Sequence, residues 1–293
     1  MKGFPAYRRR PPAEPSSREI DLARRWLARR GAPVSVPTRL LSIRIAAHTA
    51  PSTWLRTFPL HAVLALAAGV GYSSLQYLPG VAGREMTEAI PLVFVLAAIQ
   101  LSLWRARRVR ERNLAATVPH RRTGIARPIG VVDGWSAATA ATTFLGGAAL
   151  ALAMAVAVPG AWTYAWSWLG LLAVGALCTA VVVGATVREP VLAEDDASLA
   201  AAGVLRREAV VAAMPAMYAV PVLFDVFGGN RQPAAFTPLL LGYVALCLVL
   251  QLGAALAQRR WKLPPGHYGT VERTRETPPA AVSDENVWKP AAR

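Results

Sequence analysis

Apolar residues in this chain gather into six blocks that are separated by polar or Gly/Pro-rich connections. The blocks cover residues 59–78, 89–104, 135–158, 162–187, 209–227 and 236–257. A helix rises about 1.5 Å per residue, so a block of about 20 residues matches the roughly 30 Å hydrocarbon core of a bilayer. The pattern therefore predicts an all-α fold: a polytopic transmembrane bundle of six spans, arranged as three hairpins.

The connections between the blocks differ in charge, and the difference predicts an orientation. All but two of the 32 Lys and Arg residues lie in four segments, 1–58, 105–134, 188–208 and 259–293. Cationic loops resist translocation and stay on the cytoplasmic side. We therefore expect both termini and both long connections in the cytoplasm. Trp and Tyr residues near the predicted ends of the spans agree with this map, because amphipathic rings favour the membrane interface.

Three regions follow from the map. Residues 1–58 are a basic cytoplasmic arm, residues 59–258 are the six-helix transmembrane domain, and residues 259–293 are a cytoplasmic tail. The tail is polar and rich in Pro, which predicts disorder.

Within the arm, residues 20–30 and 38–48 mix apolar side chains with arginines. This mixture predicts two short amphipathic helices, of which the first is capped by Ser17. We expect both helices to lie in the cytoplasmic headgroup layer; an ordinary solvated arm is the alternative. In the second long connection, Asp195 or Asp196 is expected to cap a further helix that runs towards Arg206 and Arg207.

Composition supports a membrane protein and suggests its partners. The chain is 54% hydrophobic, has a mean hydropathy of +0.34 and carries a formal charge of +15. Because the basic residues flank the apolar blocks, we expect the lipid bilayer and its anionic lipids as partners and no nucleic acid. Arg outnumbers Lys 29 to 3, a bias typical of GC-rich bacterial genomes, which favours a multi-pass protein of the bacterial plasma (inner) membrane.

Seven basic residues are candidates for contact with lipid headgroups, each contributing on the order of 1 kcal/mol near an anionic leaflet. They are Arg24, Arg25, Arg29, Arg30, Arg105, Arg107 and Arg108.

The fifth block contains the candidates for a hinge or a cavity wall. Pro215 and Pro221 interrupt its helical hydrogen bonding, although a packed, static kink is an equal alternative. Asp225 lies near the outer end, where its carboxylate either reaches water or lines an external vestibule. Gln100 and Gln251 lie towards helix ends, where water or a neighbouring backbone can satisfy them.

No pattern of catalytic or ligand-binding residues is evident. The sequence contains no GxSxG, HExxH or Walker A motif, and its four His residues do not pair with acids at metal-ligand spacing. Cys178 and Cys247 lie inside apolar blocks without a CxxC motif, so we expect them to be packing residues. The sequence therefore predicts no enzyme, no cofactor and no metal.

Two resemblances bear on function. The stretch from Arg188-Glu189-Pro190 through Glu194-Asp195-Asp196 to Leu205-Arg206-Arg207-Glu208 resembles a loop of uncharacterised six-span membrane proteins of high-GC Gram-positive bacteria, a likeness that implies no activity. More distantly, the chain resembles permease subunits of ABC exporters. Such permeases have six spans with a basic segment before the first. They often carry a run similar to residues 51–56 of this chain (PSTWLR) at the same place.

These observations leave competing functions. One is a non-catalytic membrane protein whose basic cytoplasmic ends contact anionic lipids or a partner. The other is a permease-type subunit, which would imply a cytoplasmic ATPase or another protein subunit as partner; small-molecule transporters form a third class. The very short connection between blocks three and four departs from the permease pattern.

Overall fold

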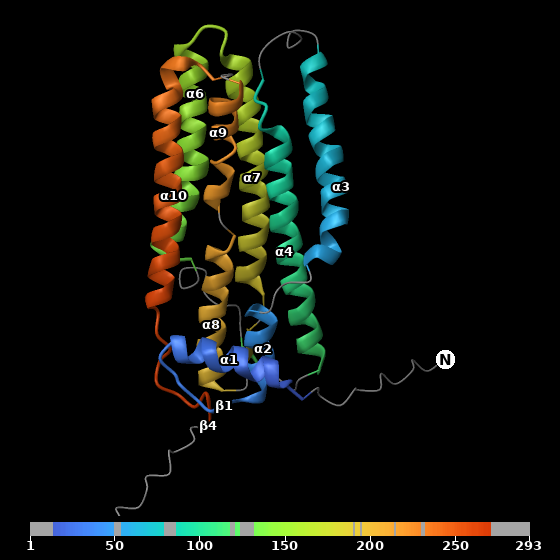
Figure 1. Ribbon diagram of the computed structural model, residues 1–293, viewed down its shortest axis with the longest axis vertical. Helices are drawn as coiled ribbons and strands as arrows, with labels where there is room; N and C mark the ends of the chain where they lie inside the picture. The colour runs from blue at the N-terminus through green and yellow to red at the C-terminus, as the bar shows by residue number, and fades with distance from the viewer. Residues whose placement is uncertain are drawn as a thin grey trace, which may run out of the picture.

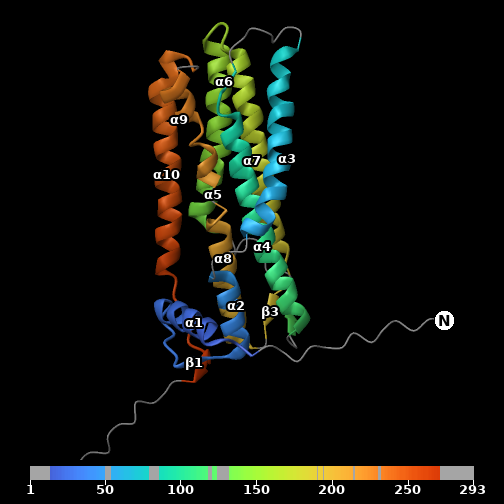
Figure 2. The ribbon, with the colours of Figure 1, turned by 45° about the vertical axis from the view of Figure 1, so that its right-hand side comes forward.

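The computed structural model describes residues 14–49, 54–78, 86–117, 121–123, 132–189, 191–193, 195–213, 215–229 and 232–270. The fold is all-α, as predicted: long helices run side by side along one axis. At one end the short helix α1 (Ser17–Arg29) lies across them, and the short helix α2 (Arg39–Thr49) stands beside it (Figures 1 and 2). We call this end the α1–α2 end and the opposite one the α6–α7 end, after the elements found there.

The helices of the bundle are α3 (Trp54–Ser73), α4 (Ile90–Thr117), α5 (Gly134–Ala141), α6 (Gly147–Ala157), α7 (Trp162–Arg188), α8 (Asp196–Val211), α9 (Val222–Phe224) and α10 (Thr237–Arg260). A π-helical turn, η3 (Thr142–Gly146), joins α5 to α6, so these two helices form one continuous rod. The 3-10 turn η1 (Ser74–Tyr77) extends α3, and η6 (Ala234–Phe236) precedes α10.

Within the described part of the chain, five helical segments are long and apolar enough to cross a membrane: Ile90–Arg112, Gly134–Ala157, Trp162–Arg188, Asp196–Gly228 and Ala234–Arg260. The expected first span is represented by a shorter apolar segment, Phe58–Ser73. Large apolar side chains are exposed on the outer faces of the bundle, among them Leu66 of α3, Leu177 of α7 and Val249 of α10. So extensive an apolar exterior is unusual for a protein surrounded by water and is compatible with an integral membrane protein.

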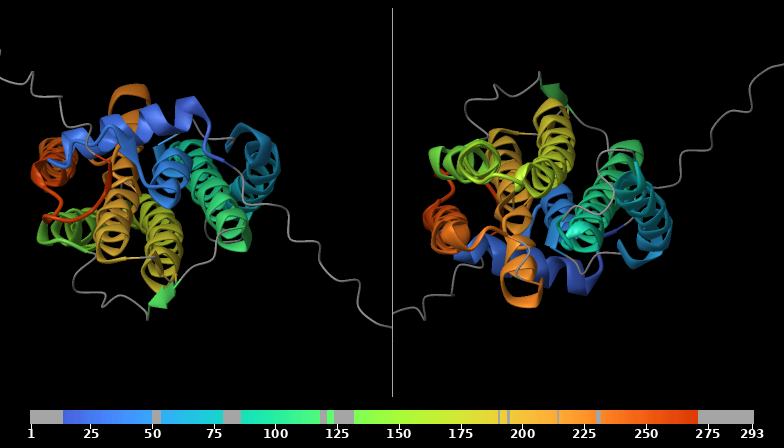
Figure 3. Two further views of the ribbon diagram at one scale, coloured as in Figure 1. Left: turned by 90° about the horizontal axis from the view of Figure 1, so that it is seen from below. Right: turned by 90° about the horizontal axis from the view of Figure 1, so that it is seen from above.

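The core of the bundle lies between α6, α7, α10 and the interrupted segment after α8. Tyr164 and Trp168 of α7 pack there with Met154, Val222 and Leu240. Helix α3 lies at the periphery beside α4 (Figure 3), and the hydroxyl of Tyr72 fixes it to α7 by donating to the Ser167 carbonyl at 2.6 Å. Burial is therefore greatest around the fifth apolar block and least at α3.

Helices α1 (Ser17–Arg29) and α2 (Arg39–Thr49) pack against the bundle at the α1–α2 end (Figure 2). Trp26 and Leu27 of α1 meet Ile45 of α2, Leu205 of α8 and Tyr268 of the returning chain in one apolar cluster. Helix α1 is amphipathic, as predicted. In α2, by contrast, Arg44 is buried together with the apolar side chains, so this helix is an internal element and not the expected surface helix.

The start of α1 and the tail correct two further predictions. Ser16, and not Ser17, is the N-cap. Its side chain accepts from the Glu19 amide, and the Glu19 carboxylate accepts from the Ser16 amide. Residues 259–270, expected to be disordered, are ordered: strand β4 (Gly269–Thr270) pairs antiparallel with β1 (Val36–Pro37). The predicted disorder of residues 271–293 falls outside the described residues.

The two long connections also have regular structure. Helix α4 continues beyond residue 104 to Thr117, so the connection expected at 105–134 begins as a helix. Strand β2 (Arg121–Thr123) then pairs antiparallel with β3 (Val191–Ala193) of the other connection. Asp195 caps α8 by accepting from the Ser198 amide at 2.7 Å, which confirms the predicted cap.

Candidate functional site

The fifth apolar block is interrupted at its middle. Helix α8 ends at Val211, a 3-10 turn η4 (Pro215–Tyr218) follows, and α9 leads into a π-helical turn, η5 (Asp225–Gly229). Pro215 and Pro221 supply no backbone N–H, so backbone carbonyls at the end of α8 need other donors.

Two glutamines supply these donors. The side-chain nitrogen of Gln100 on α4 donates to the Ala213 carbonyl at 2.9 Å, and that of Gln251 on α10 donates to the Val211 carbonyl at 3.1 Å. The Tyr218 hydroxyl donates to the side-chain oxygen of Gln100 at 2.6 Å. Both glutamines thus bond to neighbouring backbone, as the sequence predicted, although the buried side-chain oxygen of Gln251 has no hydrogen-bond partner among the described residues. Because Pro215 is buried as well, the break in the helix is packed and held by specific bonds.

Asp225 is fully buried, so it neither reaches water nor lines an external vestibule. Its carboxylate accepts from the Thr87 hydroxyl at 2.5 Å, the Glu88 amide at 2.8 Å and the Tyr164 hydroxyl at 3.0 Å. Three donors from two other parts of the chain therefore converge on it. This cluster joins the segment before α4, the first turn of α7 and the last turn of the fifth block.

A cavity of about 40 Å³ extends from the break in the fifth block towards the α1–α2 end. Ala212, Ala213 and Gln100 line the part next to the break, and Leu103 and Val182 supply apolar wall. The part of the cavity nearer the α1–α2 end is lined by charged and titratable side chains from α2, α4, α8 and the end of α7. They are Arg44, His48, Arg107, Arg108, Glu111, Glu189 and Arg206.

The charges at the cavity are unevenly matched. Arg206 is only 7% exposed; its Nη2 donates to the Glu189 carbonyl, whereas its Nη1 has no hydrogen-bond partner among the described residues. Arg108 forms an ion pair with Glu189 at 3.4 Å. Burial, together with a hydrogen bond and charge repulsion from Glu111, raises the pKa of Glu189 to about 7. The Glu189 carboxyl is therefore only partly ionised at neutral pH.

His48 is neutral at this site. Burial and then the neighbouring guanidinium groups of Arg107, Arg44 and Arg110 lower the pKa of His48 to about 3. Its Nε2 lies 3.7 Å from a carboxylate oxygen of Glu208, and because the imidazole is uncharged this polar contact is not an ion pair at neutral pH.

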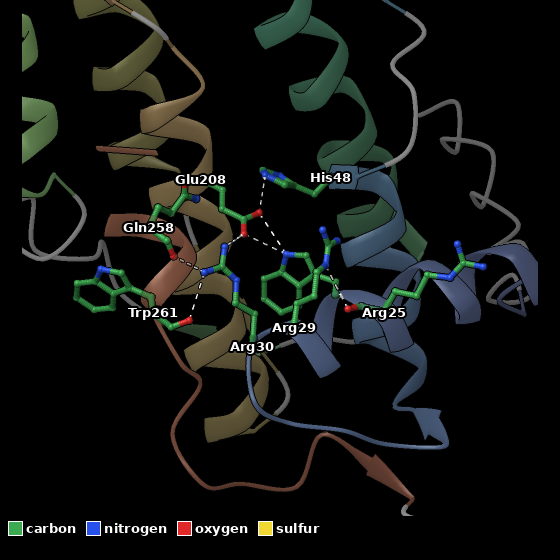
Figure 4. Close-up of polar contacts among 8 residues, drawn as sticks. Arg25, Arg29, Arg30, His48, Glu208, Gln258 and Trp261 are labelled. Atoms are coloured by element: carbon green, nitrogen blue, oxygen red, sulfur yellow. Dashed lines mark hydrogen bonds and ion pairs between the residues drawn. The ribbon is translucent and has the colours of Figure 1, made fainter. Parts of the chain in front are cut away.

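Glu208 joins α8 to the arm, and Arg30 of the arm in turn contacts α10 (Figure 4). Arg30, 8% exposed, donates to the Glu208 carboxylate and to the Gln258 carbonyl, and its Nη1 lies 3.2 Å from the Trp261 carbonyl. The indole nitrogen of Trp26 donates to the same carboxylate at 3.1 Å. Arg30 is therefore a buried structural residue, and its prediction as a lipid-facing residue is wrong.

The other predicted basic residues divide into two groups. Arg24, Arg25, Arg29 and Arg105 are exposed on α1 and α4. Arg107 and Arg108 are partly buried and line the cavity. Sequence reasoning missed Arg44, Glu189, Arg206 and Glu208 as site residues. No sequence signal singles out the two acids, because the connection of residues 188–208 holds five acidic and three basic residues.

Comparisons with protein-family models, curated proteins and solved structures find no match for this chain. Among the described residues, no group of three or more His, Cys, Asp and Glu side chains is placed to hold a metal ion.

Glu189 and His48 predict opposing dependences of stability on pH. The raised pKa of Glu189 means that the folded protein binds its proton more tightly than the unfolded chain, so its contribution to stability is lost as pH rises from about 4.5 through 7. The lowered pKa of His48 has the opposite effect, a loss of stability as pH falls from about 6.5 towards 3. The two trends offset each other over much of this range.

We therefore expect Glu189→Gln to gain stability relative to the wild type as pH rises from about 4.5 to 8, by about 1–3 kcal/mol. Thermal unfolding in detergent, followed for both proteins across this range, measures the difference and cancels the effect of His48. A constant difference at all pH values would contradict the raised pKa of Glu189.

Proposed function

We propose that this chain is a non-catalytic, multi-pass protein of the bacterial plasma membrane. It crosses the bilayer six times, with α3 as the first span and the α1–α2 end in the cytoplasm, where it contacts anionic lipid headgroups. The orientation is supported by the basic segments that gather at this end. The exposed guanidinium groups of Arg24, Arg25 and Arg29 lie there on α1, at a depth where an anionic leaflet attracts cations.

A groove at the α1–α2 end supports the proposed lipid contact. A hollow of about 550 Å³ lies between α4 and α7 near the α1–α2 end. Its lining includes Val181, Gly184, Trp104, Arg108 and Arg188, together with Glu189, which is ion-paired with Arg108. Val181 and Arg188 are exposed, and no atom lies within 4 Å of the position that a side chain at Gly184 would occupy. Apolar wall therefore lies directly beside guanidinium groups, a combination that suits an acyl chain and its phosphate.

The indole of Trp104 adds a donor to the groove. Its Nε1 has no hydrogen-bond partner among the described residues, and the guanidinium of Arg108 lies over the indole ring at 5.1 Å. A bound phosphate or glycerol oxygen would accept from this N–H, which is otherwise buried without a partner.

We expect the purified protein, reconstituted in mixtures of phosphatidylglycerol and phosphatidylcholine, to retain the anionic lipid preferentially, and more weakly as salt is raised. Arg188→Gln should lower this preference several-fold, while Arg188→Lys, which keeps the charge, should retain most of it. Mass spectrometry of retained lipid measures the ratio. Equal retention of both lipids by the wild type would refute the proposal.

A permease-type transmembrane subunit of an ABC exporter is the second candidate. The interruption of the fifth block favours it, because interrupted helices form substrate sites in many transporters. This candidate requires a partner ATPase that co-purifies with the chain and whose binding depends on the α1–α2 end. If no ATPase co-purifies from the native host membrane, the first proposal is favoured.

A further inference from the structure

We propose that the cavity between α2, α4, α7 and α8 binds one small monovalent inorganic anion, of which chloride is the abundant example, with Arg206 as its central ligand. This site adjoins the lipid groove, with which it shares Trp104, Arg108 and Glu189, but its central ligand Arg206 does not line that groove.

Arg206 is the first reason. Its Nη2 donates to the Glu189 carbonyl. Its Nη1 is buried at the cavity and has no acceptor among the described residues. Burying a charged donor without an acceptor is costly. An anion in the cavity would supply both the acceptor and the opposite charge.

The balance of charge is the second reason. Four guanidinium groups line the cavity, those of Arg44, Arg107, Arg108 and Arg206, against the two carboxyl groups of Glu111 and Glu189. Positive charge stays in excess even with both carboxyl groups ionised. Protonation of Glu189 increases that excess.

The size and lining of the cavity select the class of anion. About 40 Å³ is several times the roughly 10–15 Å³ that one water needs, but it is far too small for a nucleotide or a lipid headgroup. Leu103, Val182, Ala209 and Ala212 supply apolar wall, which disfavours strongly hydrated anions such as sulfate. A halide with one or two waters fits both constraints.

Anion binding should be linked to protons. The groups that face Glu189 are Arg108 and Glu111 from α4, Arg206 from α8 and, at longer range, Arg44 from α2. A bound anion repels the ionised form of Glu189 and so favours its protonated form. Chloride should therefore bind more tightly at pH 6 than at pH 8.

The test uses the full chain in detergent at constant ionic strength, with chloride replaced stepwise by gluconate. We expect the melting temperature to rise saturably with chloride and bromide but not with gluconate or sulfate. Arg206→Gln should weaken chloride binding about tenfold or more, the loss of one hydrogen bond to a charged group. The exposed control Arg25→Gln should bind as the wild type does.

A second variant keeps the test decisive if Arg206→Gln does not fold. Glu189→Gln removes a negative charge with little change of size, so it should tighten chloride binding at pH 8 about tenfold and remove its pH dependence. The inference is overturned if wild-type stability does not respond saturably to chloride. It is also overturned if the response is the same in Arg206→Gln, or if Glu189→Gln leaves it unchanged.

Discussion

Glu208→Ala is expected to lower the free energy of unfolding by about 3–5 kcal/mol, because it leaves the buried guanidinium of Arg30 without its carboxylate. It also removes the acceptor of the Trp26 indole. These contacts join α8 to the arm, so the arm should become sensitive to protease at a lower temperature than the bundle unfolds. Denaturant titration in detergent and limited proteolysis measure the two effects.

The controls separate burial from charge. Asp21→Ala removes an ion pair with Arg24 that is 4.0 Å long and about half exposed, so it should change stability by no more than about 0.5 kcal/mol. Replacing both buried partners, as Arg30→Met with Glu208→Leu, should recover much of the loss, because neither charge is then left unpaired. A Glu208→Ala protein as stable as the Asp21→Ala protein would show that the Arg30 contact contributes nothing.

Asp225→Ala should have an effect of similar size, about 3–5 kcal/mol, because three buried donors lose their acceptor together. Asp225→Asn keeps one acceptor oxygen and should lose less. Since the donors come from the segment before α4 and from α7, the loss should loosen the α6–α7 end, which hydrogen exchange of the amides near Glu88 would detect.

The partly buried carboxylate of the α5 cap provides a comparison. Asp133 accepts from the Ser136 amide at 2.7 Å, and replacing it with alanine should cost only about 1 kcal/mol, the usual value of an N-cap. If Asp225→Ala cost no more than Asp133→Ala, the buried cluster would not be a structural centre.

The helical blocks were predictable because their apolar length is a local property of the chain. The same holds for the Asp195 cap and for the break in the fifth block, since the capping side chain and the two prolines act on their own backbone. The ends of helices were less predictable: α4 continues past residue 104 because arginines are good helix formers, and charge alone does not end a helix.

The site depends on contacts between distant parts of the sequence, which composition and periodicity do not reveal. Arg30 resembles the exposed arginines of α1 in sequence, but the returning chain covers it when the Leu263 amide donates to its carbonyl at 2.9 Å. Asp225 appeared free to reach water because its donors at Thr87 and Tyr164 lie in other blocks. Arg206 and Glu189 come together only because α8 folds back on the end of α7.

The most direct test of the account is the membrane topology. In a chain whose two cysteines, Cys178 and Cys247, are replaced by serine, single cysteines are placed by Arg25→Cys at the α1–α2 end and by Pro159→Cys at the α6–α7 end. A membrane-impermeant maleimide applied to intact cells stripped of their wall should label Pro159→Cys, and should label Arg25→Cys only after permeabilisation. Labelling of Arg25→Cys in sealed cells, or release of the protein from membranes by alkaline carbonate, would contradict a bundle that spans the bilayer with its basic end in the cytoplasm.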